Sequence, residues 1–280
     1  MEVTLLGTGD TTGTPTPGCR CDTCEEARER GIERSRFSVH VESAAGESLL
    51  IDASPDLRQQ FLAHEVPLPD AIVITHIHFD HLDGLGNAYR LLGPRGGGDE
   101  PVPVYASEVV DEVTEESVAE TIARKYDYLD SVTVEPTPPL VPFETCGLRV
   151  ELVPVEHPPL SCYGVVIEDL ETGGKLSLTG DTSYAIPPKS RERLAGADLM
   201  LADGIVPANL CERHPHGGRH EDEDGVFRTF GTKHMTREGA LDLARELDAA
   251  EVRVVHVAHY YPAEEAFEEP LAVDGERYRL

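Results

Sequence analysis

Four side chains of types that commonly bind metal ions lie close together after an apolar run. His76, His78, Asp80 and His81 fall within six residues and follow the apolar residues 71–74, with Thr75 between them. On a strand end or loop, alternate residues project to one side, so His76, His78 and Asp80 can converge on one point. The adjacent His81 can reach a second point nearby. The spacing favours two neighbouring metal sites over a solvated histidine-rich turn, because unpaired imidazoles and carboxylates are costly beside a buried strand.

Three further candidate ligands accompany later apolar runs. His157 follows residues 148–155, Asp181 follows residues 175–179, and His256 lies within the last expected strand. Each is at a point where a strand can deliver a side chain to a shared rim. These residues can therefore complete the ligand sets that the first four side chains begin.

A separate cluster of thiols lies near the start of the chain. Cys19, Cys21 and Cys24 fall within six residues. In a reducing compartment such a trio favours metal ligation over disulfides, and a closed, sulfur-rich zinc site would need a fourth ligand from elsewhere in the chain. His259, three residues after His256, is the best candidate for that ligand. Buried or oxidised cysteines are the alternative interpretation.

The elements that must position these side chains are short apolar strands separated by helices. Strands are expected at residues 3–6, 38–41, 49–51, 71–74, 102–105, 131–135, 148–155, 162–168, 175–179 and 252–257. Helices are expected after Ser54, from about residue 82 to 92, at 107–126, and after Thr236. Strands in both halves of the chain with helices between them predict an α/β protein with two sheets packed face to face and helices outside.

A long polar segment at residues 204–231 interrupts this pattern. It contains Cys211, His214, His216 and His220, which suggest a third metal site. A loop of this size is more often functional or mobile, so we interpret the segment as a variable lid over the metals, with solvated or substrate-contacting histidines.

The histidine motif and its later partners resemble the metallo-β-lactamase superfamily over nearly the whole chain. The resemblance implies one domain over residues 1–280 with a four-layer αββα sandwich. It implies one metal on His76, His78 and His157, a second on Asp80, His81 and His256, a bridging Asp181, and an Asp52 that supports the ligand histidines from behind. For Asp52 alone, an ordinary strand-end or helix-capping aspartate remains an alternative.

Segments near the start of the chain narrow the resemblance. The sequence Gly-Thr-Gly at residues 7–9, Gly-Thr-Pro at 13–15 and the cysteine trio are similar to the phosphodiesterase branch of the carbon–phosphorus lyase pathway, which acts on phosphoribosyl cyclic phosphate. That branch implies a structural zinc on the three cysteines and His259, besides two active-site metals, zinc or manganese. It also implies that His234 contacts the substrate phosphate or protonates the leaving oxygen, whereas a surface-loop histidine is the alternative.

These features together predict a metal-dependent phosphodiesterase that acts on a small cyclic or diester phosphate. Two metals ~3.5–4 Å apart can deprotonate a bridging water and stabilise charge on the attacked phosphoryl group, with Asp80 and His234 as catalytic residues. A transfer-RNA 3′-end endonuclease, a quinone-cofactor biosynthesis relative with non-hydrolytic chemistry, and a metal-dependent binding module remain alternatives. The segment at 204–231 departs from the phosphodiesterase pattern and leaves the substrate open.

The charge of the chain restricts its partners. The 280 residues include 24 Lys and Arg against 52 Asp and Glu, a formal net charge of −28. Such a surface repels nucleic acid and anionic membranes, so we expect a small anionic phosphodiester as partner. The sequence is also compatible with a homodimer.

The chain starts with no recognisable export signal and has no apolar run of ~20 residues, which predicts a cytoplasmic protein. A halophilic, salt-adapted protein explains the charge best, and an acidic protein of an ordinary cytoplasm is the alternative.

If the acidic surface is an adaptation to salt, hydrolysis of a charged diester should persist or rise between dilute buffer and about 1 M salt. At that concentration the Debye length falls to ~3 Å, which removes most of the repulsion between the protein and its anionic substrate. Initial rates measured across this range test the expectation. A steady loss of activity with rising salt would contradict it.

Overall fold

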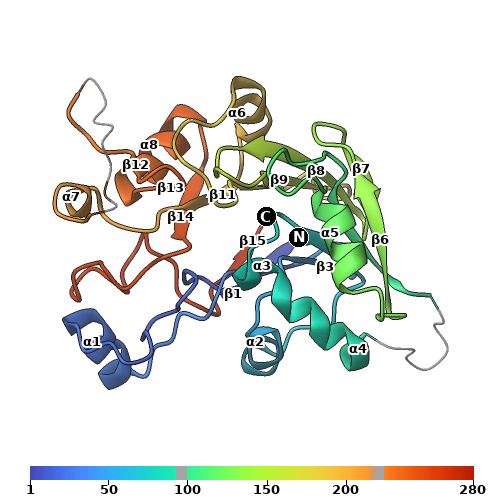
Figure 1. Ribbon diagram of the computed structural model, residues 1–280, viewed down its shortest axis with the longest axis horizontal. Coiled ribbons are helices and arrows are strands. Elements are labelled where there is room, and N and C mark those ends of the chain that lie inside the picture. Colours follow the sequence, from blue (N-terminus) through green and yellow to red (C-terminus); the bar gives the residue numbers. More distant parts are fainter. Residues whose placement is uncertain (93–99, 216, 218–223) are drawn as a thin grey trace.

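Two large β-sheets dominate the computed structural model, which describes residues 1–92, 100–215, 217 and 224–280 (Figure 1). In spatial order, one sheet contains β15 (Arg277–Arg279), β1 (Glu2–Gly7), β2 (Ser38–Glu42), β3 (Ser48–Ile51), β4 (Ala71–Ile74), β5 (Val102–Ser107) and β6 (Val132–Thr137). The other contains β14 (Glu251–Val255), β11 (Leu199–Asp203), β10 (Lys175–Leu178), β9 (Cys162–Asp169), β8 (Leu148–Val155) and β7 (Phe143–Thr145).

Strand β11 of the six-stranded sheet is buried on both faces. In β11, Leu199 and Leu201 belong to the core that also contains the strands of the seven-stranded sheet, whereas Met200 and Ala202 belong to a second core with the last long helix. Successive strand residues point to opposite faces, so this alternation places one sheet against the other and a helix on the outer side. The apolar run of β11 therefore forms a strand between two layers of the protein core.

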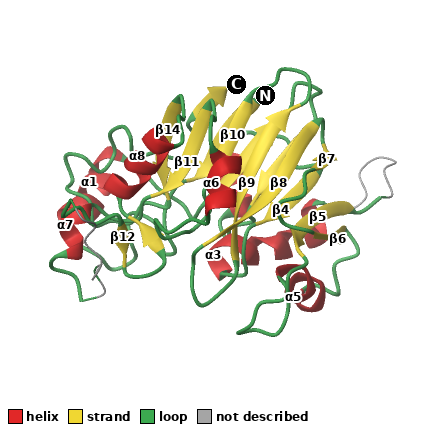
Figure 2. Cartoon of the chain, turned by 90° about the horizontal axis from the view of Figure 1, so that it is seen from above, coloured by secondary structure: helices red, strands yellow, loops and turns green. Residues whose placement is uncertain are grey.

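Helices lie on the outer sides of the two sheets (Figure 2). The described helices are α1 (Asp22–Arg30), α2 (Leu57–His64), α3 (Phe79–Leu82), the 3-10 helix η1 (Asp83–Asn87), α4 (Ala88–Leu91), α5 (Val118–Lys125), α6 (Pro188–Leu194), α7 (Ala208–Cys211) and α8 (Arg237–Glu246). Helices α2 and α5 pack against the seven-stranded sheet, and α6 and α8 pack against the six-stranded sheet. This confirms the predicted four-layer αββα arrangement. None of the helices in the described ranges has the length and apolarity needed to cross a bilayer.

The helix predicted at residues 107–126 is much shorter, because α5 begins only at Val118. The Ser117 hydroxyl accepts a hydrogen bond from the Glu120 N–H, while the Glu120 carboxylate accepts one from the Ser117 N–H. Before this cap, the Asp111 carboxylate accepts hydrogen bonds from the Val113 and Thr114 N–H groups, which diverts the backbone from helix.

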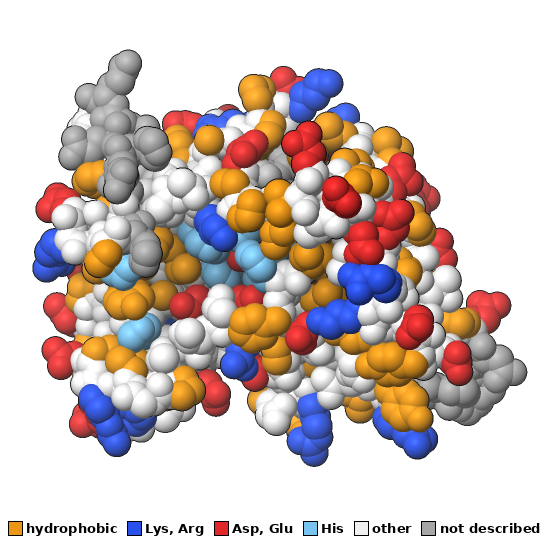
Figure 3. All heavy atoms as spheres, in the orientation of Figure 1, with side chains coloured by type: hydrophobic (Ala, Val, Ile, Leu, Met, Phe, Trp, Pro, Cys, Tyr) orange, Lys and Arg blue, Asp and Glu red, His pale blue; other side chains and the backbone are white. Residues whose placement is uncertain are grey.

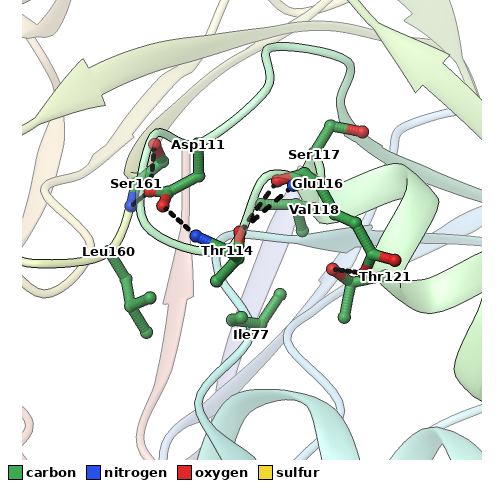
Figure 4. A pocket seen from close by; sticks show the side chains of 9 residues that line it. All are labelled: Ile77, Asp111, Thr114, Glu116, Ser117, Val118, Thr121, Leu160 and Ser161. Atoms are coloured by element: carbon green, nitrogen blue, oxygen red, sulfur yellow. Dashed lines mark hydrogen bonds between the residues drawn. The ribbon is translucent and has the colours of Figure 1, made fainter.

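Asp111 also connects this irregular segment to a distant part of the chain. Its second carboxylate oxygen accepts the Ser161 N–H at 2.6 Å and the Ser161 hydroxyl at 2.7 Å (Figure 4). Ser161 lies four residues after His157, and Ile77 of the histidine motif lines the same small pocket. The segment after β5 thus packs against two stretches of chain that carry candidate ligands.

The segment at residues 204–231 is only partly a loop. It contains α7 and strand β12 (Thr229–Phe230), which pairs antiparallel with β13 (His234–Met235). Elements of four and two residues carry no periodicity, so the sequence pattern could not reveal them. Cys211 is buried at the end of α7, and the His214 ring lies 5.3 Å from that of Phe230. His216 and His220 lie outside the described residues.

The ends of the chain pair with each other in the seven-stranded sheet. Strand β15 runs antiparallel to β1, and the Met1 amino group donates to the Leu280 carbonyl at 2.8 Å. Next to this pairing, the half-buried Asp274 binds two other segments. Its carboxylate accepts the N–H and hydroxyl of Thr8, both at 2.8 Å, and the N–H and hydroxyl of Ser35, at 2.7 and 2.6 Å.

Titration of Asp274 should make stability fall as pH rises through the acidic range. Burial raises the pKa of Asp274 to about 7, although its hydrogen bonds with Ser35 and Thr8 oppose the shift. The folded chain thus holds this proton more tightly than the unfolded chain, whose Asp titrates near ~3.9. Its stabilising contribution is complete below about pH 4 and is lost towards about pH 7, at up to about 1.4 kcal/mol per pH unit.

Urea unfolding of the wild type and Asp274→Asn at about pH 5 and about pH 8 measures this contribution, because other titrating groups are common to both proteins. We expect the free energy of unfolding of the wild type to exceed that of Asp274→Asn by a larger amount at about pH 5 than at about pH 8. A difference in unfolding free energy that is constant or larger at the higher pH would show that the carboxylate stays charged in the fold.

Candidate metal centre

The histidine motif begins two residues after β4 and continues into α3. The helix starts at Phe79, earlier than the predicted start near residue 82, so Asp80 and His81 lie within its single turn. His76, Asp80 and His81 are buried. Strand β4 runs parallel to its neighbour β3, and the carboxyl ends of parallel strands meet at one edge of a sheet. The motif therefore lies beside Asp52, the residue that follows β3.

One group of candidate ligands consists of His76, His78, His157 and Asp181. Each offers a nitrogen or oxygen atom, and these atoms all lie within 4.8 Å of one another. His78 Nδ1 lies 2.9 Å from His76 Nε2 and 3.3 Å from His157 Nε2. Asp181 Oδ2 lies 3.8 Å from His76 Nε2. Three imidazoles and one carboxylate around a point form a set that suits a divalent transition metal.

A second group consists of Asp80, His81 and His256, and it adjoins the first through Asp181. Asp80 Oδ2 lies 3.6 Å from both His81 Nε2 and His256 Nε2. The same Asp181 oxygen that approaches His76 lies 3.4 Å from His81 Nε2 and 3.3 Å from His256 Nε2. One carboxylate oxygen thus faces both groups, which is the position that a bridging ligand would need.

Buried nitrogen atoms without hydrogen-bond partners indicate that this arrangement fits a cation. His81 Nε2 and His256 Nε2 are buried and form no hydrogen bond with any residue in the described ranges. An unsatisfied buried polar atom costs free energy, so such atoms need an explanation. Both nitrogens face the carboxylates of Asp80 and Asp181 at distances that a bound metal would fill, and the side chains present are therefore compatible with metal ligation.

The charges of the metal-free chain support the same conclusion. Burial disfavours the charged form of His256, but Asp181 and Asp80 outweigh it and raise its pKa to about 9. Burial likewise opposes ionisation of Asp181, yet His256 and His81 hold its pKa well below the usual range. Without metal, the buried carboxylates are thus balanced by imidazolium groups, and cations would take over this role.

Asp52 contacts the ring nitrogen of His81 that faces away from the other candidate ligands. Its carboxylate accepts the Thr75 N–H and hydroxyl, both at 2.8 Å, and lies 2.7 Å from His81 Nδ1, which leaves His81 Nε2 directed at the other ligands. The backbone of Asp52 has a φ of 59°, and that of His256 has a φ of 58°. Such values are strained for residues other than glycine and often accompany functional sites. His256 consequently lies just after β14, not within the predicted strand.

His234 lies beside both groups and is held by Asp203. Its Nδ1 atom is 3.0 Å from Asp203 Oδ2, and its ring stacks on that of His256 with centroids 5.0 Å apart. Asp203 is fully buried, and its other oxygen lies 3.8 Å from His256 Nδ1. Asp203 was not among the predicted site residues, although it ends an apolar strand much as Asp52 follows one. That shared position was the signal that could have identified it.

The cysteine trio and His259 form a separate group. His259 Nδ1 lies 3.3 Å from Cys19 Sγ, 3.4 Å from Cys21 Sγ and 3.6 Å from Cys24 Sγ. All three thiols are free, and no disulfide forms among the described cysteines. Three sulfurs and one imidazole nitrogen are a typical set for a closed tetrahedral zinc site.

His78 and His234 are the half-buried histidines of the candidate centre, whereas His76, His81, His157 and His256 are buried. Figure 3 shows histidine side chains gathered in a hollow near the centre of this face, with hydrophobic and basic side chains around it. A ligand could approach the candidate metal centre from this side.

Comparison with known proteins identifies relatives that align with most of this chain. A family model described as a beta-lactamase superfamily domain matches residues 47–257. The chain is 30% identical over 293 residues to coenzyme PQQ synthesis protein B of Methylobacterium radiotolerans, covering 94% of this chain and 91% of that protein. It is 28% identical over 271 residues to an octanoyltransferase of Porphyromonas gingivalis, covering 94% of this chain and 47% of that protein. The chain therefore spans about half the length of the latter relative.

Solved structures show the same fold. A diphosphatase from the PhnP family has 29% sequence identity and a TM-score of 0.78, with 99% of this chain and 96% of that chain covered. Zinc-bound PqqB from Methylobacterium extorquens has 22% identity and a TM-score of 0.76, with both chains covered completely. The family model covers most of the chain and includes every candidate ligand of the dinuclear arrangement, and the chain thus belongs to the beta-lactamase superfamily, with its metallo-β-lactamase fold.

Proposed function

We propose that this chain is a metal-dependent hydrolase that cleaves a small, cyclic phosphodiester such as phosphoribosyl cyclic phosphate. The observation that carries the proposal is the single Asp181 oxygen within 3.8 Å of His76 Nε2 and within 3.4 Å of His81 Nε2. A carboxylate in this position suits two adjacent divalent metals. The likeness to a PhnP-family diphosphatase supports chemistry at phosphorus.

In the proposed centre, His76, His78 and His157 hold one metal, Asp80, His81 and His256 hold the other, and Asp181 bridges them. When bound, two zinc or manganese ions supply an activated water and stabilise charge on the phosphoryl group. The protein orients the ligands: Asp52 fixes His81, and the carbonyl of Lys233 lies 2.9 Å from His157 Nδ1 and fixes that ring.

His234 is the proposed general acid. The Asp203 carboxylate accepts its Nδ1–H, which leaves Nε2 to deliver a proton to the leaving oxygen or to contact the substrate phosphate. Asp203 also accepts hydrogen bonds from the Thr182 and Met235 N–H groups at 3.0 and 3.3 Å, so its orientation is fixed by the backbone. Cys19, Cys21, Cys24 and His259 would hold a structural zinc outside this centre.

Two other similar proteins, coenzyme PQQ synthesis protein B and tRNase Z, suggest alternative functions for this chain. Coenzyme PQQ synthesis protein B shares 30% identity over nearly the whole chain, so a role in cofactor synthesis is the second candidate function. The human tRNase Z structure, at 18% identity, shares the fold alone. The net charge of −28 opposes an RNA substrate, since RNA affinity depends on neutralised phosphates. Activity on a diester distinguishes the hydrolytic proposal from cofactor synthesis.

The purified protein should contain about three metal ions per chain, two in the active centre and one in the cysteine site. Elemental analysis by mass spectrometry measures this content. Cys21→Ser should lower the content by about one ion, whereas His78→Ala should lower the content of the active centre and spare the cysteine-bound zinc. A wild-type protein that holds a single ion after reconstitution would refute the dinuclear assignment.

The metal-loaded protein should hydrolyse a chromogenic phosphodiester, with a phosphomonoester and a β-lactam as control substrates. His234→Ala should lower kcat about 10²–10⁴-fold for an alkyl ester, because an alkoxide must be protonated as it leaves. The loss should be smaller for a nitrophenyl ester, whose leaving group needs little protonation. Steady-state kinetics on both esters measure this difference.

Asp203→Asn is the matched control, because it keeps the imidazole and removes the carboxylate that orients it. We expect the same leaving-group dependence with a smaller loss. Equal losses on both esters would assign His234 to phosphate binding, and no diester hydrolysis with zinc, manganese or nickel would defeat the proposed function.

A further inference from the structure

The loop between β1 and α1 lies beside the segment that follows β14 (Figure 1). The Asp10 N–H donates to the carbonyl of Val257 at 3.3 Å, and the Val257 N–H donates to the Thr8 carbonyl at 2.9 Å. Val257 directly follows the candidate ligand His256. The loop is therefore anchored next to the second group of candidate ligands, which consists of Asp80, His81 and His256.

Within this loop, Thr11 contacts a candidate ligand directly. Its hydroxyl donates to Asp80 Oδ2 at 2.9 Å. The same oxygen lies 3.6 Å from both His81 Nε2 and His256 Nε2, so it is the oxygen that would face the second metal. A carboxylate oxygen has two lone pairs and can accept this hydrogen bond while it binds a cation.

The contact with Thr11 differs from the other contacts of Asp80. The two imidazoles near Asp80 belong to groups that would bind the same ion. Thr11 is outside that set, as Asp52 is for His81. Residues that contact metal ligands from outside orient them, and their loss typically lowers metal affinity by about 10–100-fold.

The backbone of Thr11 is fixed by its neighbours, although the residue is exposed. Arg36 Nε donates to the Thr11 carbonyl at 3.1 Å, and an ion pair at 2.7 Å holds Arg36 on Asp56. On the other side, the Asp10 carboxylate accepts the Thr12 N–H at 3.1 Å, which closes a turn around Thr11. The hydroxyl is thus held at a defined distance from the ligand carboxylate.

We infer that Thr11 is a positioning residue for the second metal, which would bind Asp80, His81 and His256. This inference rests on the dinuclear centre of the proposed function and is independent of the substrate. The described hydrogen bonds of Thr11 include none with the first group of candidate ligands. Loss of the hydroxyl should therefore weaken the binding of one metal and spare the other.

Thr11→Val tests the inference, because it removes the hydroxyl and keeps the shape of the side chain. Calorimetric titration of the metal-depleted protein with Mn²⁺ measures both affinities. Mn²⁺ prefers oxygen ligands to thiolates, so the titration reports on the active centre and not on the cysteine site. We expect the affinity for the second ion to fall about tenfold or more, and that for the first to stay within about twofold of the wild type.

Two further variants separate the hydroxyl from the loop. Thr11→Ser keeps the hydroxyl and should restore most of the affinity for the second ion. Thr12→Val is the matched control, because the Thr12 hydroxyl lies in the same loop but donates to Asp10 at 3.1 Å. It should bind both ions as the wild type does.

Electron paramagnetic resonance provides a second measurement that does not depend on activity. An isolated Mn²⁺ ion and a coupled pair of Mn²⁺ ions give different signals. At equal metal content, Thr11→Val should show more of the isolated-ion signal than the wild type and Thr12→Val.

Equal affinity for the second ion in Thr11→Val and Thr12→Val would overturn the role of Thr11 and leave the dinuclear centre intact. Loss of both ions in Thr11→Val, or no recovery in Thr11→Ser, would also refute a selective role of the hydroxyl. A wild type that binds only one Mn²⁺ ion would overturn the dinuclear centre together with this inference. Failure of the wild type to hydrolyse a diester would instead refute the proposed function alone.

Discussion

The need to neutralise buried carboxylates governs the centre of this structure. Asp52, Asp80, Asp181 and Asp203 are all nearly inaccessible to solvent. An isolated buried anion costs more free energy than a typical domain has in reserve. The chain meets this cost with imidazoles from four segments that converge on the same carboxylates. Of these, His81 and His256 have raised pKa values and carry the balancing positive charge when metal is absent. The same arrangement accommodates cations, since it already places electron-pair donors around two adjacent points.

Strand direction brings these residues together. Strands β3 and β4 are parallel and end at Asp52 and the histidine motif, while β10, β11 and β14 are parallel and lead to Asp181, Asp203 and His256. Each set lies at the carboxyl edge of its own sheet. The face-to-face packing of the sheets joins the edges, and the candidate centre therefore depends on the fold of both halves of the chain.

The sequence allowed prediction of the layers and of most of the candidate site. Apolar, β-branched runs are reliable signals for buried strands, and the motif at His76 to His81 is dense enough to stand out. The predicted start of α5 was wrong because the Asp111 carboxylate forms hydrogen bonds with the following backbone N–H groups, and these compete with helix formation. Hydrophobic periodicity does not reveal such hydrogen bonds. Asp203 was missed because a lone aspartate after an apolar run is common. Its role follows only from the contact with His234, 31 residues away.

The pairing of the chain ends has a consequence for folding during synthesis. Strand β1 pairs with β15, and Glu2 lies opposite Arg279 in that ladder. Asp274, which binds Thr8 and Ser35, belongs to the same late segment. Until the segment that carries Asp274 and β15 has emerged from the ribosome, the β1 edge of the seven-stranded sheet is unpaired, and such edges recruit other chains. Closure of this edge therefore depends on a segment far from β1 in the sequence, and β1 must remain protected until that segment has been synthesised.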